Sequence, residues 1–227
     1  MGLGGNAGSV LAKINSVTTV RFIGDVHGYW GRYRRAIRDV PFSIQVGDMG
    51  VGFYSYRHGE VLPASNPPFS NMSKGRHLFI RGNHDNPDVC KRQRYWIPDG
   101  TMVEGIFCLG GAASMDRTHR IEGMDWWPDE ELSTAELEEH VSRYAALKPD
   151  IVCTHECPDS VARDVMAPYR VGRIDDGSRT RKALECMLQL HRPRFWVFGH
   201  WHTPVQFMRE GTTFRCLAEL ECLDMDI

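Results

Sequence analysis

The sequence predicts an α/β protein in which helices cover the faces of a β-sheet. Short apolar runs alternate with longer amphipathic stretches, an order typical of strands and helices packed in layers. Polar, metal-capable side chains follow directly after several of these runs, at the carboxyl ends of strands, where α/β folds place their sites. With 227 residues, the chain is long enough for one substantial core. The glycine-rich residues 1–15 are expected to be loosely ordered, and residues 16–227 to form a single domain.

The first half of the chain predicts three strands and one helix. Residues 17–23 are rich in β-branched side chains and predict the first strand. Residues 30–39 have helical spacing and many arginines. The apolar runs 42–46 and 77–80 predict the next two strands. Residues 51–75 form a long insertion. It could be a binding loop or a lid, or a solvent-exposed loop without a role.

The second half predicts a similar alternation that closes with a hairpin. The clearest helix start is Ser133 followed by Glu136, the pattern of a capping box. Residues 158–176 are expected to be irregular, with side chains at the site entrance that include Arg163, Tyr169, Arg170 and Arg173. The predicted elements are a strand at 106–109, a helix at 132–147, a strand at 150–153, a helix at 179–190, a strand at 195–198, and a hairpin of 205–208 and 213–216.

Composition excludes several classes of protein. The formal net charge of −2 gives no global basic field to attract nucleic acid. No stretch approaches the roughly 18 apolar residues of a membrane span, and the first residues do not resemble a secretory signal. The seven scattered cysteines predict reduced thiols and a cytoplasmic protein without a membrane partner. Cys153 and Cys157 flank His155, but no second close pair accompanies them, so no separate zinc site is expected.

Five short motifs join metal-capable side chains to glycines or turns, and most follow an apolar run. They are Gly24-Asp25-Val26-His27-Gly28, Gly47-Asp48-Met49-Gly50, Arg81-Gly82-Asn83-His84-Asp85, Thr154-His155-Glu156 and Gly199-His200-Trp201-His202. Such a mixture of carboxylate, amide and imidazole suits manganese, iron, nickel or zinc, whereas calcium and magnesium prefer oxygen alone. Two such ions about 3.5–4 Å apart can hold a hydroxide and clamp a phosphate.

Taken one at a time, these residues have ordinary structural explanations. Asp25 and Asp48 could cap turns, and Asn83 could form an Asx turn. His155 alone would more often be a satisfied polar residue near the core. The joint occurrence of five motifs in one order favours a site over these explanations. The histidines outside the motifs are expected on the surface or behind the site, and they are His58, His77, His119, His140 and His191.

The five motifs resemble the signature of the calcineurin-like metallophosphoesterases, which reads D-x-H, G-D, G-N-H-(D/E), a lone His, and G-H-x-H. The resemblance covers roughly Val20 to Pro204. It implies a four-layer α/β/β/α sandwich and two divalent metal ions, with manganese expected and iron, nickel or zinc as alternatives. The second motif lacks the longer form found in Ser/Thr phosphoprotein phosphatases, which favours the small bacterial phosphodiesterases and the nuclease-related branch of the family.

The resemblance also implies a role for each motif residue. Asp48 would bridge the two metals, and a hydroxide between them would be the nucleophile. His84 would be the general acid, oriented by Asp85, because an imidazole with a pKa near 6.5 suits proton transfer at neutral pH. The implied ligands are Asp25, His27 and His202 for the first metal, and Asn83, His155 and His200 for the second.

Arginines after the strand at 106–109 are candidates for substrate binding. The segment Leu109–Arg117, with Arg120 nearby, resembles one in the bacterial and phage branch of the family. Arg117 or Arg120 could bind a phosphate oxygen. The alternative is that Asp116 and Arg117 pair to hold the loop.

Three functions are weighed on this basis. The favoured function is hydrolysis of phosphodiester bonds in a nucleotide, cyclic nucleotide or nucleic acid. The alternative is a phosphomonoesterase acting on nucleotides, metabolites or phosphoproteins. A non-catalytic interaction module on the same fold is disfavoured, because every implied ligand and His84 are present.

Overall fold

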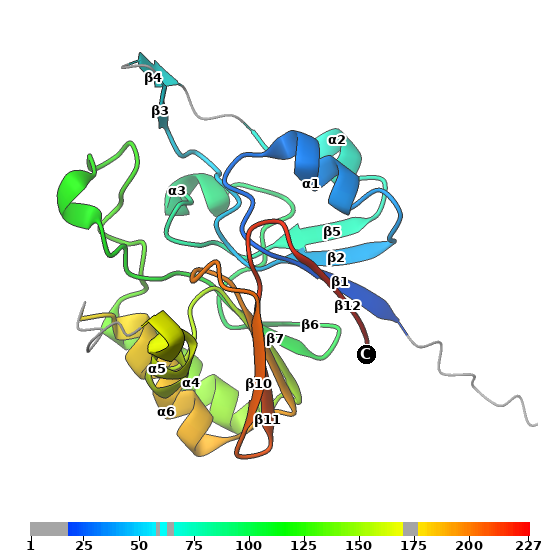
Figure 1. Cartoon of the computed structure of the whole chain (residues 1–227), viewed down its shortest axis with the longest axis vertical. Coiled ribbons are helices and arrows are strands. Elements are labelled where there is room, and N and C mark those ends of the chain that lie inside the picture. The colour runs from blue at the N-terminus through cyan, green and yellow to red at the C-terminus, as the bar shows by residue number, and fades with distance from the viewer. Residues whose placement is uncertain (1–17, 58–59, 63–65, 170–176) are drawn as a thin grey trace, which may run out of the picture.

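The computed structural model describes residues 18–57, 60–62, 66–169 and 177–227, and it arranges them in four layers (Figure 1). Two β-sheets lie face to face in the middle, with helices on both outer sides. The α/β class and the four-layer sandwich predicted above are confirmed. The predicted disorder of residues 1–15 lies outside the described residues.

The first sheet has four strands in the order β12-β1-β2-β5. Strands β1, β2 and β5 are parallel, and β12 runs antiparallel to β1 at the edge. Strand β12 was not predicted, because polar residues interrupt its apolar positions. The bounds are Thr19–Ile23 for β1, Phe42–Gln45 for β2, Arg76–Phe79 for β5 and Cys222–Asp226 for β12.

The second sheet has six strands in the order β10-β11-β9-β8-β7-β6. Its four central strands are parallel, and an antiparallel strand flanks each side. Residues Glu210 and Gly211 both have positive φ, as a tight hairpin between β10 and β11 requires. The bounds are Thr101–Val103 for β6, Ile106–Leu109 for β7, Ile151–Thr154 for β8, Phe195–Phe198 for β9, Val205–Arg209 for β10 and Thr212–Cys216 for β11.

Alternation along the strands divides the buried side chains among three cores. Successive strand residues point to opposite faces. Val197 in β9 therefore packs between the two sheets with Phe22 and Ile44, while its neighbour Trp196 packs against the helices on the outer side. Because both faces of the central strands of the second sheet are covered, β7 and β9 are continuous apolar runs.

The helices cover the outer faces of the two sheets. Helices α1 to α3 lie on the side of the first sheet, and α4 to α6 pack on the second (Figure 1). Among the helices that the structure describes, none is long and apolar enough to cross a bilayer. The bounds are Trp30–Ala36 for α1, Phe69–Met72 for α2, Pro87–Cys90 for α3, Thr134–Leu147 for α4, Asp159–Met166 for α5 and Arg179–Leu190 for α6, with 3₁₀ turns η1 at Arg117–His119 and η2 at Ala167–Tyr169.

Two segments predicted as loops contain regular structure. Residues 51–75 include the antiparallel pair β3 (Ser55–Arg57) and β4 (Glu60–Leu62), followed by α2. Residues 158–176 begin with α5, so the prediction of an irregular segment was wrong there. Helix α5 is short, but Val161 and Val165 are buried in the core shared with α6, and this tertiary packing stabilises it.

The topology brings the five motifs together at one edge of the sandwich. Each motif is the loop that directly follows one of the parallel strands β1, β2, β5, β8 and β9. Since parallel strands end at the same edge of a sheet, the two sheets present all five loops to each other.

The predicted capping box is present at the start of α4 and sets a test of helix stability. Ser133 Oγ accepts a hydrogen bond from Glu136 N, and Glu136 Oε2 accepts one from Ser133 N. We expect Ser133→Ala to lower the free energy of unfolding by about 1 kcal/mol. Urea denaturation at constant m would measure it. Ser142→Ala, on the exposed side of the same helix, is the control and should change stability by less than about 0.5 kcal/mol. Equal effects of the two substitutions would contradict the role of the cap.

Candidate metal centre

Four residues of the motifs have a left-handed backbone. The φ angles are 45° at His27, 56° at Asp48, 64° at His200 and 49° at His202. Non-glycine residues adopt this conformation rarely, and when they do they concentrate at functional sites. The loops after β1 and β2 are also joined directly, because Val26 N and His27 N both donate to the Asp48 carbonyl. The backbone is therefore bent at the positions where side chains converge.

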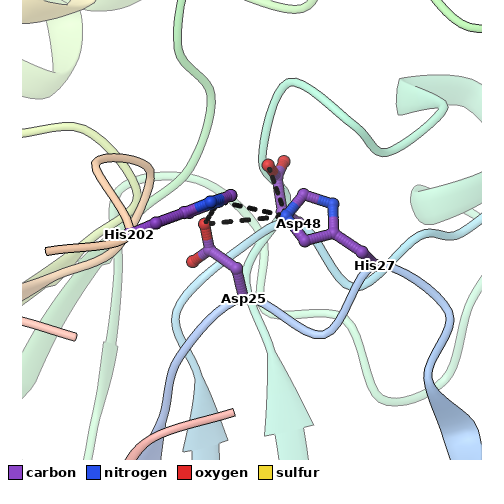
Figure 2. Close-up of side chains that lie close together, drawn as sticks. All are labelled: Asp25, His27, Asp48 and His202. Atoms are coloured by element: carbon purple, nitrogen blue, oxygen red, sulfur yellow. Dashed lines mark hydrogen bonds and ion pairs between the residues drawn. The ribbon is translucent and has the colours of Figure 1, made fainter. Parts of the chain in front are cut away.

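The first cluster consists of Asp25, His27, Asp48 and His202 (Figure 2). One ligand atom from each of the four lies within 4.8 Å of the others. His202 Nε2 is 2.8 Å from Asp25 Oδ2, and the Nε2 atoms of His27 and His202 are 3.1 Å apart. His27 Nε2 is 3.8 Å from Asp48 Oδ2. Two imidazoles and two carboxylates thus face one point.

The second cluster lies on the other side of Asp48. Asn83 Oδ1 is 3.1 Å from His155 Nε2 and 3.0 Å from His200 Nδ1. His155 Nε2 is also 3.3 Å from Asp48 Oδ1. One oxygen of Asp48 therefore faces each cluster, and the structure brings all seven predicted ligands together.

Burial makes the charges of this centre strongly interdependent. Asp25 and Asp48 are almost inaccessible to solvent. Burial opposes ionisation of Asp48, but the adjacent imidazole of His155 holds its pKa well below the usual range. Burial likewise opposes protonation of His155, yet Asp48 raises the pKa of that imidazole to about 10. A hydrogen bond to Asp25 raises the pKa of His202.

The donor set and the tautomer of His155 fit divalent metal ions. His155 Nδ1 donates a hydrogen bond of 2.9 Å to the Val46 carbonyl. This bond leaves Nε2 as the ring nitrogen that faces Asp48 and Asn83, and such a bond is the usual way in which a histidine ligand is oriented. Carboxylate, amide and imidazole together suit borderline metals such as manganese.

A second layer of side chains, which the sequence did not identify, orients Asn83. The Asn83 amide nitrogen donates to Ser114 Oγ at 3.0 Å, and Ser114 donates in turn to Glu130 at 2.5 Å. These bonds turn the Asn83 oxygen toward the histidines. Ser114 lies in the same segment after β7 as the candidate substrate arginine Arg117, but no local sequence pattern pairs it with Glu130, sixteen residues later.

Glu156 supports the motif loops that follow β8 and β9, a role that its motif does not predict. Its side chain is completely buried. Oε1 accepts hydrogen bonds of 2.8 Å from Trp201 Nε1 and from Cys157 N, and Oε2 lies 3.7 Å from His200 Nε2. Arg181 is 3.8 Å from the same oxygen. Glu156 thereby links the loop of His155 to the loop of His200.

His84 lies at the cleft and contacts an arginine. Its backbone N–H donates to Asp48 Oδ1 at 2.7 Å, and its ring stacks on Phe53 with centroids 4.8 Å apart. Arg120 Nη2 is 2.8 Å from His84 Nε2. Since guanidinium only donates, this nitrogen accepts and the ring is neutral. Burial, assisted by the Arg120 charge and opposed by Asp48, lowers the pKa of His84 to about 4.

Asp85 binds backbone rather than the His84 ring. Its carboxylate accepts four N–H bonds of 2.7–3.0 Å, from Met49, Gly50, Val51 and Gly82. Burial and the nearby Asp48 raise its pKa to about 6, although these bonds favour the ionised form. Asp85 therefore holds the loop that carries Asp48, and its influence on His84 runs through the backbone.

The two candidate substrate arginines differ in position. Arg120 lines a cleft of about 520 Å³ beside the clusters, together with Met115, Asp116, Met166 and Trp201. Asp116 pairs with Arg120 through two hydrogen bonds, not with Arg117 as the alternative proposed. Arg117 is exposed on η1 and is not among the lining residues.

Of the arginines predicted at the site entrance, one is described in full. Arg163 is exposed on α5, pairs with Asp159 and does not line the cleft. Arg170, Arg173 and the side chain of Tyr169 lie outside the described residues.

The fold and these clusters define a metallophosphoesterase, and comparison with known families agrees. The sequence matches the model of the calcineurin-like phosphoesterase family over residues 18–204. The chain belongs to that family. No curated protein matches the sequence.

Two solved structures are similar to this chain. A putative 5'-nucleotidase from Staphylococcus aureus aligns over 90% of this chain and 49% of its own, with a TM-score of 0.50 and 15% identity. The present chain thus spans about half the length of that protein. GAP50, described as the anchor in the inner membrane complex of Plasmodium, aligns over 88% of this chain and 72% of its own, with a TM-score of 0.43 and 10% identity.

The four hydrogen bonds accepted by Asp85 predict that its carboxylate stabilises the loops of the site. Asp85→Asn keeps the shape but points an NH₂ group at backbone donors, so we expect the free energy of unfolding to fall by about 3 kcal/mol or more. Chemical denaturation of the metal-free protein would measure the loss. Asp129→Asn, which changes an exposed carboxylate, is the matched control and should shift stability by less than about 0.5 kcal/mol. A loss no larger than that of the control would contradict this assignment.

Proposed function

We propose that this chain is a dinuclear metal-dependent hydrolase of phosphodiester bonds. The observation that carries the proposal is the Asp48 carboxylate, which faces one cluster with each oxygen. A carboxylate in that position is what a pair of metal ions requires as a bridge. The proposed ligands are Asp25, His27 and His202 on one side, and Asn83, His155 and His200 on the other.

The chemistry divides between the bound ions and the chain. Two divalent ions, when bound, activate water and neutralise charge on the phosphoryl oxygens. Manganese is the proposed ion, with iron, nickel and zinc as alternatives. The chain holds the ligands in place through Ser114, Glu156 and Asp85, none of which depends on substrate. A cytoplasmic location is proposed with this activity, because five of the cysteines are buried and none of the seven forms a disulfide.

His84 is proposed to protonate the leaving oxygen. It lies at the cleft beside Asp48, within reach of a group bound at the clusters. Arg120 occupies its Nε2, so delivery of a proton from this atom requires Arg120 to turn away. Phosphoryl oxygens attract a guanidinium strongly. We infer that bound substrate draws Arg120 away from His84, that the uncovered Nε2 then takes up a proton from solvent, and that this proton passes to the leaving oxygen.

The charge of the cleft favours diesters. Among its described lining residues, Arg120 is the one arginine or lysine, and Asp116 already pairs with it. A diester carries one negative charge and needs less neutralisation beyond the ions than a dianionic monoester. Met115, Met166 and Trp201 offer apolar contacts for a second substituent on phosphorus. A nucleotide, cyclic nucleotide or nucleic-acid end is the proposed substrate class.

Hydrolysis of monoesters is the second candidate. The observation in its favour is the position of the Arg120 guanidinium beside His84, where it could bind the additional non-ester oxygen of a terminal phosphate. Nucleotides, metabolites or phosphoproteins would then be the substrates.

The ratio of two rates tests the substrate class. With manganese restored to metal-stripped protein, we expect faster hydrolysis of bis-p-nitrophenyl phosphate than of p-nitrophenyl phosphate, because the cleft holds little positive charge. The kcat/KM values for the two esters would measure the preference. A higher value for the monoester would replace the diester proposal. No hydrolysis of either ester with manganese, iron, nickel or zinc would contradict the enzymatic function itself.

The bridging role of Asp48 has its own test. Asp48→Asn should reduce bound manganese from near two ions to fewer than one, because both clusters lose a shared charge, and activity should fall at least about 100-fold. Metal analysis after dialysis would measure the stoichiometry. Asp88→Asn, an exposed carboxylate on α3, serves as the control with two ions retained. Metal content near the wild-type value in the Asp48 variant would rule out the bridge.

A further inference from the structure

A second hollow lies beside α1 and shares no residue with the cleft of the proposed metal centre. Its volume is about 450 Å³, in the range of small-molecule sites. It is lined by residues of α1 and the segment after it, of α2 and the turn after it, and of β5. The polar lining includes Arg34, Arg35, Arg38, Asn71, Lys74 and His77.

Four cationic side chains face this hollow without carboxylate partners. Within the described part of the chain, Arg34, Arg35, Arg38 and Lys74 have no acidic oxygen within 4.0 Å. By contrast, two arginines on strands of the first sheet are paired with carboxylates. Arg21 binds Asp224 and Arg76 binds Glu104, and Asp39, next in sequence to Arg38, acts electrostatically on Arg21. Four like charges around one concavity repel one another unless an anion lies among them.

A buried histidine and an amide complete the lining. His77, expected on the surface or behind the site, is 2% exposed and borders this hollow instead. Ser43 Oγ bonds its Nδ1 at 2.9 Å, and Nε2 has no hydrogen-bond partner among the described residues. Asn71 adds a neutral donor. A polar side chain held in place by the core is a feature of a formed site and not of a solvated face.

The helix dipole accounts for only part of this arrangement. Arg34 and Arg35 lie in the last turn of α1, where cations are favoured. Lys74 and His77 belong to other elements, so their presence in the same lining does not follow from the dipole. Polar side chains from α1, from the turn after α2 and from β5 therefore line the same hollow.

The lining selects the class of ligand. Three guanidinium groups and one ammonium match phosphoryl oxygens, and their four charges exceed what a single phosphate balances. The apolar lining is limited to Ile37 and Val40, and the described lining has no phenylalanine, tyrosine or tryptophan on which a base could stack. We propose that this hollow binds an oligophosphate, that is, two or three linked phosphoryl groups. This proposal is independent of the function proposed for the metal centre.

Calorimetric titration of inorganic tripolyphosphate into the full chain tests the proposal. In low salt, Arg34→Gln combined with Arg38→Gln should weaken binding at least about tenfold, because two charge-assisted contacts are lost. Arg143→Gln combined with Lys182→Gln is the matched control. These exposed cations on α4 and α6 also lack acidic partners among the described residues, and binding should stay within about twofold.

Two further arms exclude other binding sites and other ligands. Asp48→Asn should bind tripolyphosphate as the wild type does, whereas loss of binding in this variant would place the ligand at the metal centre and overturn the proposal. Equal binding by the Arg34/Arg38 variant and the wild type would also overturn it, as would no binding at all. A twelve-nucleotide thymidine strand that binds where tripolyphosphate does not would assign the surface to nucleic acid instead.

Discussion

The site depends on how one buried carboxylate, Asp85, holds the loop that carries another, Asp48. Asp85 collects N–H groups from Met49, Gly50 and Val51, which follow Asp48, and from Gly82, which lies near His84. These bonds join the loops after β2 and β5. They also help to hold Asp48 in its left-handed conformation, which an aspartate rarely adopts without support. Without this anchor, neither oxygen of Asp48 would have a fixed direction.

Glycines allow the loops to approach so closely. A Cβ atom on Gly82 would lie 2.1 Å from Asp48 Oδ1, and one on Gly47 would lie 2.3 Å from His155 Nδ1. Gly47 also has a φ of 102°, a conformation open chiefly to glycine. The glycines of the motifs therefore serve the geometry of the centre, because ligands from the two sheets could not otherwise converge on Asp48.

The local motifs were predictable because each combines its chemistry with its turn in a few consecutive residues. A strand, a glycine and a metal-capable side chain are adjacent in sequence at Asp25, Asp48 and His200, so the chain order indicates the geometry. The support for these residues was not predictable in the same way. Ser114 reaches Asn83, and Trp201 reaches Glu156, across long sequence separations that leave no local pattern. The topology alone creates these contacts.

The same distinction explains the errors in the predicted fold. Strands β7 and β9 were predicted because both of their faces are apolar. Strand β12 was missed because it lies at an edge with alternating exposure, and α5 was missed because it is short and packs mainly on α6. Elements that are stabilised mainly by one tertiary neighbour have only a weak secondary-structure signal in their local sequence.

The net charge of the chain conceals two local environments that differ in charge. At the cleft, Arg120 is balanced by Asp116 and touches His84, so positive charge there is small and committed to specific contacts. Along α1, three arginines and Lys74 face one hollow without acidic neighbours in the described chain. A net charge of −2 therefore excludes a general attraction for polyanions but not a local one. The small positive charge of the cleft supports the proposed hydrolysis of singly charged diesters, and the four cations of the hollow support the proposed binding of a multiply charged phosphate chain.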